Sequence, residues 1–155
     1  MTRRHGDMGD GTTTRYDETI RLPCEPRSVR LARCFVDAVL ARLGWGDLDR
    51  ELAQLVTSEL VANAVLYAPG SLAIRCAVDG VARIDVVDDH VDAAVRSVPR
   101  GPDEIGGLGL QLIGQVAREW GVERGPRSKT VWCVVEPRRA PAPRRPTRLA
   151  DCGGG

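Results

Sequence analysis

Apolar side chains repeat along this chain with two different periods, and each period predicts a type of element. In the N-terminal half they recur every three or four positions, which predicts helices over 28–43 and 47–67. Ser28 is the expected N-cap of the first helix. The same period returns later in the chain and predicts a third helix over 107–120.

Elsewhere apolar and polar residues alternate, which is the period of a half-buried strand. Strands are predicted over residues 18–22, 72–77, 81–88, 122–124 and 129–136. The second and third strands form a hairpin, in which a loop over 78–80 pairs Ala77 with Val81. Gly80 then takes the left-handed position that such a loop requires. With this loop the apolar residues of both strands face the same way.

The order of the elements predicts the fold class. A strand, two helices, a hairpin, a helix and a second hairpin favour an α+β fold, a two-layer sandwich whose mostly antiparallel mixed sheet carries helices on one face. Residues 89–105 show little periodicity, so we expect a long functional loop there. We place the domain at 18–137, after a flexible N-terminal arm over 1–17 and before a disordered Arg/Pro/Gly-rich tail over 138–155.

Composition narrows the class of protein. The 155 residues suggest one domain, and 43% hydrophobic with 28% charged residues is typical of a soluble globular protein. No apolar run approaches the ~20 residues of a membrane span, and the N-terminus lacks the apolar core of a secretory signal. We therefore expect a cytoplasmic protein without membrane contact. The cysteines lack CxxC spacing and the two histidines lie far apart, which favours buried reduced thiols and no zinc site.

The charge is unevenly distributed, although the net charge is only +1. The tail over 138–155 holds five arginines against one aspartate, so the rest of the chain is slightly acidic. Five arginines could contact nucleic acid weakly. The acidic remainder and the low aromatic content of 4% argue against a nucleic-acid-binding protein, and we expect a solvated tail.

Two polar residues interrupt the apolar stripe of the second helix. Glu59 and Asn63 lie one turn apart and share its face. Such residues are expected to line a wet or ligand-filled cavity, because burying an unpaired carboxylate is costly. There an Asn oxygen is a hard ligand for Mg²⁺, and a carboxylate can accept a proton from a hydroxyl. A solvated helix face or a satisfied buried pair would explain the same two residues.

Two further interruptions follow. Asp88 ends the apolar row of the strand over 81–88, where a carboxylate can accept a hydrogen bond from an exocyclic amine such as that of adenine, or can cap the next turn. Gly106, Gly107 and Gly109 open the third helix, where exposed amides and the helix dipole suit a phosphate. A plain glycine-rich turn is the alternative, and the Gly-Lys-Ser/Thr signature of a P-loop is missing.

Taken in order, the segments TSELVANAVLYA, IDVVDD, GGLGLQLI and SKTVWCVV resemble the GHKL (Bergerat-fold) ATPase superfamily. They are most similar to its anti-sigma factor serine/threonine kinase branch, and the resemblance covers residues 18–137. It implies the GHKL ATP-binding fold with ATP and Mg²⁺ as ligands. It also implies that the chain binds a sigma factor or its antagonist, an anti-anti-sigma protein, and phosphorylates a serine of the antagonist. Because this branch tends to dimerise, a homodimer is implied as well.

The resemblance implies a role for each matching residue. Asn63 would coordinate Mg²⁺ at the ATP phosphates, and Glu59 would act as the general base. Asp88 would bind the adenine amine, and Thr130 would support the adenine end of the site.

The loop and the glycines belong to the phosphate end of the implied site. Gly107 and Gly109 would close over the phosphates, and the loop over 89–105 would be the ATP lid. Within that loop Arg96 and Arg100 are candidates to meet phosphate, on grounds of charge alone.

The second motif departs from the family pattern. The family commonly has Asp-x-Gly-x-Gly, whereas Asp88 is followed by Asp-His-Val-Asp without a glycine. The backbone there has less freedom to approach a base, and the added acids disfavour a polyanion. Two functions therefore stay open: an ATP-dependent serine kinase, and a non-catalytic protein-binding module in which ATP is structural or lost.

Overall fold

The computed structural model describes residues 16–67, 70–89 and 109–138. Its elements, in chain order, are β1 (Tyr16–Pro23), α1 (Pro26–Arg42), α2 (Asp47–Tyr67), β2 (Ser71–Asp79), β3 (Val81–Asp88), α3 (Gly109–Val116), β4 (Glu119–Arg124) and β5 (Lys129–Val135). This is the predicted order of elements, and α2 has the predicted bounds.

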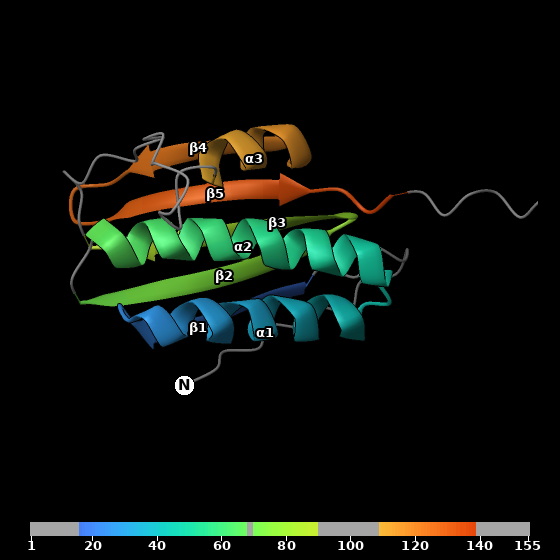
Figure 1. Ribbon diagram of the computed structural model, residues 1–155, viewed down its shortest axis with the longest axis horizontal. Coiled ribbons are helices and arrows are strands. Elements are labelled where there is room, and N and C mark those ends of the chain that lie inside the picture. Colours follow the sequence, from blue (N-terminus) through green and yellow to red (C-terminus); the bar gives the residue numbers. More distant parts are fainter. Residues whose placement is uncertain (1–15, 68–69, 90–108, 139–155) are drawn as a thin grey trace, which may run out of the picture.

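The five strands form one sheet in the order β1-β2-β3-β5-β4, in which every neighbouring pair is antiparallel. Figure 1 shows α1 and α2 side by side across one face of the sheet, with α3 beside β4 and β5. The predicted α+β fold with helices on one face is confirmed, and the described strands pair in the antiparallel sense throughout. No helix in the described ranges is long and apolar enough to cross a membrane.

The β2–β3 hairpin turns more tightly than predicted. Asp79 pairs with Val81 across Gly80, so Ala77 lies opposite Arg83 instead of Val81. Gly80 has a φ of +72°, the left-handed conformation expected for it. Because the partner of Ala77 changes by an even number of residues, no side chain changes face, and the apolar residues of both strands are buried as predicted.

Helix α1 begins before the residue predicted to cap it. Its N-cap is Glu25, and Pro26 occupies the first helical position, where a missing backbone N–H is harmless. Ser28 lies inside the first turn, so its predicted role as N-cap is wrong. Its hydroxyl instead donates a hydrogen bond to the carbonyl oxygen of Pro23 at 2.6 Å, which ties the helix to the end of β1.

The third helix is shorter than predicted. It ends at Val116, and Trp120, which the helical spacing placed on the apolar face of the helix, lies in β4 opposite Cys133. Strand β4 pairs with β5 along its whole length. These backbone hydrogen bonds outweigh the local helical pattern, as tertiary context often does.

The core fills the space between the helices and the covered face of the sheet. It is built from aliphatic side chains and two cysteines, which fits the low aromatic content. Its buried members are Ala32, Val36, Val39, Leu40, Ala53, Val56, Leu60, Val61, Ala64, Leu72, Ile74, Cys76, Val78, Ala82, Ile84, Val86, Ile113, Val131, Cys133 and Val135. Burial raises the pKa of the Cys76 thiol to about 12 and that of Cys133 to about 12. Both are buried free thiols as predicted, whereas Cys34 is exposed and Cys24 is half-buried.

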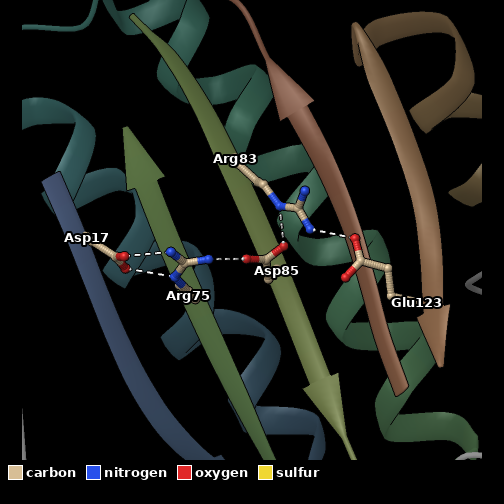
Figure 2. A network of polar contacts seen from close by, with 5 residues as sticks. All are labelled: Asp17, Arg75, Arg83, Asp85 and Glu123. Atoms are coloured by element: carbon tan, nitrogen blue, oxygen red, sulfur yellow. Dashed lines mark hydrogen bonds and ion pairs between the residues drawn. The ribbon is translucent and has the colours of Figure 1, made fainter. Parts of the chain in front are cut away.

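A row of ion pairs crosses the uncovered face of the sheet (Figure 2). At its centre is Asp85, whose side chain is 5% exposed and contacts Arg75 at 3.1 Å and Arg83 at 2.8 Å. Arg75 also binds Asp17 of β1, and Arg83 binds Glu123 of β4 at 3.0 Å. The hydrogen bonds from Arg75 lower the pKa of Asp17. The network links four strands and satisfies a carboxylate that this face nearly buries.

We expect Asp85→Asn to destabilise the protein by about 1–3 kcal/mol, because two guanidinium groups lose their shared buried carboxylate. Asp17→Asn is the matched control, since its exposed ion pair with the same Arg75 should contribute about 0–1 kcal/mol. Urea unfolding of both variants measures the difference. Equal destabilisation by the two substitutions would contradict a central role for Asp85.

Candidate functional site

Helix α2 carries the first two predicted site residues over the centre of the sheet. Glu59 and Asn63 are both half-buried and lie one turn apart on this helix. The helix packs against β3, β5 and α3, so the face that makes these contacts lies between the sheet and the third helix. Desolvation by burial raises the pKa of Glu59 above its usual value of 4.5. A partly desolvated carboxylate beside an amide is an arrangement suited to accepting a proton.

Asp88 forms a buried ion pair at the end of β3. Its side chain is 1% exposed, and Oδ2 lies 3.4 Å from Nζ of Lys129, whose side chain is 3% exposed. The two residues are direct cross-strand partners, because Asp88 is the last residue of β3 and Lys129 is the first of β5. Opposite residues of an antiparallel pair project from the same face. Both charges therefore lie on the helix-covered face of the sheet.

A cysteine connects Asp88 with helix α2. The thiol of Cys24, just after β1, donates a hydrogen bond to the carbonyl oxygen of Ala64, the residue after Asn63. Desolvation raises the pKa of this thiol, and the negative charge of Asp88 raises it further. Leu22 and Asp88 both pair with Leu72, so Cys24 lies at the end of the sheet that holds Asp88. The second half of α2 and the end of β3 therefore meet at the same edge of the sheet.

The structure does not bring Thr130 to this edge. Thr130 is the cross-strand partner of Val87, so it projects from the uncovered face, opposite to Asp88. The residue beside Asp88 is Lys129, to which the sequence motifs assign no role. The alternation of β5 contained the signal: Val131, Cys133 and Val135 are apolar and buried, and the same parity assigns Lys129 to the covered face.

The glycine-rich segment is described only in part. Gly109 is the first residue of α3 that the structure describes. Gly107, Arg96 and Arg100 lie outside the described residues, and so does the loop that contains the two arginines. Their predicted contacts with phosphate stay predictions.

The donors that are present fit a magnesium nucleotide. Within the described ranges, no group of three or more His, Cys, Asp or Glu side chains could hold a metal ion. The amide oxygen of Asn63 is a hard ligand of the kind that joins nucleotide and water oxygens where Mg²⁺ binds phosphates. Glu59 and Asn63 are both half-buried, and polar contacts are stronger where water is partly excluded.

Comparison with known proteins identifies the family and a shared fold. Residues 22–135 match the family described as histidine kinase-like ATPase domain. No curated protein matches the chain. Among solved structures, the chain is similar to the crystal structure of the RsbU and RsbW domains of Rv1364c from Mycobacterium tuberculosis, with 18% sequence identity and a TM-score of 0.56. The match covers 76% of this chain and 32% of that one, so the chain spans about a third of its length. This likeness shows a shared fold.

Proposed function

This chain belongs to the family of histidine kinase-like ATPase domains, and on that premise we propose that it binds Mg-ATP between α2, α3 and the ends of β3 and β5. We further propose that it controls a sigma factor or the antagonist of one in the cytoplasm, by binding it and by phosphorylating a serine. The observation that carries the proposal is the buried carboxylate of Asp88 at the end of β3, on the sheet face that is covered by the helix bearing the half-buried Glu59 and Asn63.

The proposed chemistry is phosphoryl transfer from ATP to a serine hydroxyl. Glu59 accepts the hydroxyl proton, a task for which its raised pKa suits it. Asn63 holds Mg²⁺, which when bound neutralises charge on the phosphates. Asp88 accepts a hydrogen bond from the adenine amine and so fixes the far end of the nucleotide. The helix start at Gly109 directs backbone amides to the phosphates.

The partner is proposed from two supports. The anti-sigma factor kinase branch is the one that the motifs most resemble, and the solved structure of similar fold contains a domain named RsbW. We propose that a homodimer is the form that binds the partner. The described residues hold exposed apolar side chains on α1 and α2, among them Leu31, Leu55 and Leu66.

Asp88→Asn tests the nucleotide site. The variant keeps the size of the side chain but replaces a charged acceptor, and we expect ATP binding to weaken about tenfold to a hundredfold. Asp89→Asn is the control, because Asp89 is the exposed next residue. Calorimetric titration of ATP into both variants, with thermal unfolding to show that they are folded, gives the comparison. Equal affinities of the two variants for ATP would refute a contact between Asp88 and the base.

A non-catalytic protein-binding module is the second candidate. The ion pair between Asp88 and Lys129 favours it, because the carboxylate assigned to the base already has a charged partner. The same module would bind its partner without transferring phosphate to it, with ATP either structural or lost. Phosphate appearing on the partner would exclude this second candidate.

A further inference from the structure

The sole lysine of this chain occupies the base end of the proposed nucleotide site. Lys129 is one of 22 basic residues, and all the others are arginines. It is also the one buried cation among the residues that the structure describes. Burying an ammonium requires a partner, and Asp88 supplies it across the strand pair. Nothing in the function proposed above uses this charge.

Each member of the pair has more hydrogen-bonding positions than their mutual contact occupies. The separation of 3.4 Å between Nζ and Oδ2 is longer than the ~2.7–2.9 Å of a strong charge-assisted hydrogen bond. A carboxylate has about four acceptor positions and an ammonium has three donors, so each group can serve a ligand while the two stay close. An arginine could not replace the lysine, because its planar fork would favour a bidentate contact with the carboxylate.

The pair presents an acceptor and a donor side by side. Adenine offers the complementary order on one edge: the exocyclic amine is a donor, and the adjacent ring nitrogen N1 is an acceptor. We propose that Lys129 is a base-specificity residue that donates a hydrogen bond to N1 of adenine while Asp88 accepts one from the amine. This inference rests on the proposed function, and it adds a second contact to the base.

The same pair disfavours guanine. Guanine has a carbonyl oxygen where adenine has its amine, and a protonated N1 where adenine has an acceptor. In the same pose the oxygen would face the carboxylate of Asp88, and the N1 hydrogen would face the ammonium of Lys129. Both contacts would be repulsive, and buried polar groups that lose their partners discriminate strongly. The site should therefore reject GTP.

The test compares ATP, GTP and 1-deaza-ATP, in which carbon replaces N1, on the full chain and on Lys129→Met. We expect the wild-type protein to bind 1-deaza-ATP and GTP at least about tenfold more weakly than ATP. Lys129→Met should weaken the binding of ATP by a similar factor, and the variant should bind ATP and 1-deaza-ATP equally. ATP binding by Lys129→Met that equals or exceeds the wild type would overturn the proposal, because Lys129 would then be neutral or a competitor for Asp88.

Two further measurements protect the test against a misfolded variant. Lys129→Gln keeps a donor, so it should bind ATP more tightly than Lys129→Met. In wild-type protein labelled with ¹⁵N-lysine, the single side-chain Nζ signal should shift with ATP and much less with 1-deaza-ATP. A signal that does not shift when ATP binds would refute this inference and leave the proposed function standing. A folded wild-type protein that binds no nucleotide would refute both.

Discussion

Asn63→Ala is expected to abolish the magnesium dependence of ATP binding. Asn63 supplies the one amide oxygen on the site face of α2, and without it Mg²⁺ loses its only predicted protein ligand. ATP affinity in magnesium should fall at least about tenfold, toward the value measured in EDTA. Calorimetric titration with and without magnesium measures both affinities.

Gln54→Ala is the matched control for this substitution. Gln54 lies on the same helix, but its amide donates a hydrogen bond to Asp37 of α1 at 3.0 Å and faces away from the proposed site. It tests the effect of removing an amide from α2 without touching the ligand. A folded Asn63→Ala protein that keeps full magnesium-dependent affinity would remove Asn63 from the site.

Glu59→Gln is expected to stop phosphoryl transfer while leaving ATP binding nearly intact. The amide cannot accept the proton of the attacking hydroxyl, and loss of a general base typically lowers the rate by about 10²–10⁴. Because the partner is unidentified, the assay measures the slow transfer of phosphate from ATP to water. The appearance of inorganic phosphate gives its rate. Glu51→Gln, an exposed residue of the same helix, is the control.

The same substitution has a signature in stability. Burial raises the pKa of Glu59, so the folded protein favours the protonated carboxyl more than the unfolded chain does. The stability that this raised pKa contributes is present below the usual pKa of 4.5. It is lost as the pH rises through the pKa of Glu59 in the folded protein. Glu59→Gln should therefore be at least as stable as the wild type at pH 7, with an advantage that fades toward pH 4. Lower stability of the variant at pH 7 would contradict a desolvated carboxylate.

The sequence predicted those parts of the fold that depend on local periodicity. Helix α2 was correct in its bounds, because an acidic N-terminus and the proline after its C-terminus mark both ends of a long apolar stripe. The parity of the β2–β3 hairpin was also correct, since alternation decides which residues share a face. The hairpin register was wrong because several loop lengths preserve that parity.

What the sequence missed depends on contacts between distant segments. Trp120 fits a helical spacing, but it lies in β4 because it pairs with Cys133 of β5. Thr130 matched a family position, yet the register of β5 against β3 puts Lys129 beside Asp88 instead. The buried ion pair follows from that register. It could be expected from the alternation of β5 only after β3 was known to be its neighbour.

The central claim is that this chain is a magnesium-dependent ATP-binding protein. Calorimetric titration of ATP into the full chain, with magnesium and then with EDTA, tests it most directly. We expect saturable binding of one ATP per chain that weakens at least about tenfold in EDTA. No heat of binding at millimolar ATP, from protein that thermal unfolding shows to be folded, would contradict it and leave the protein-binding module in its place.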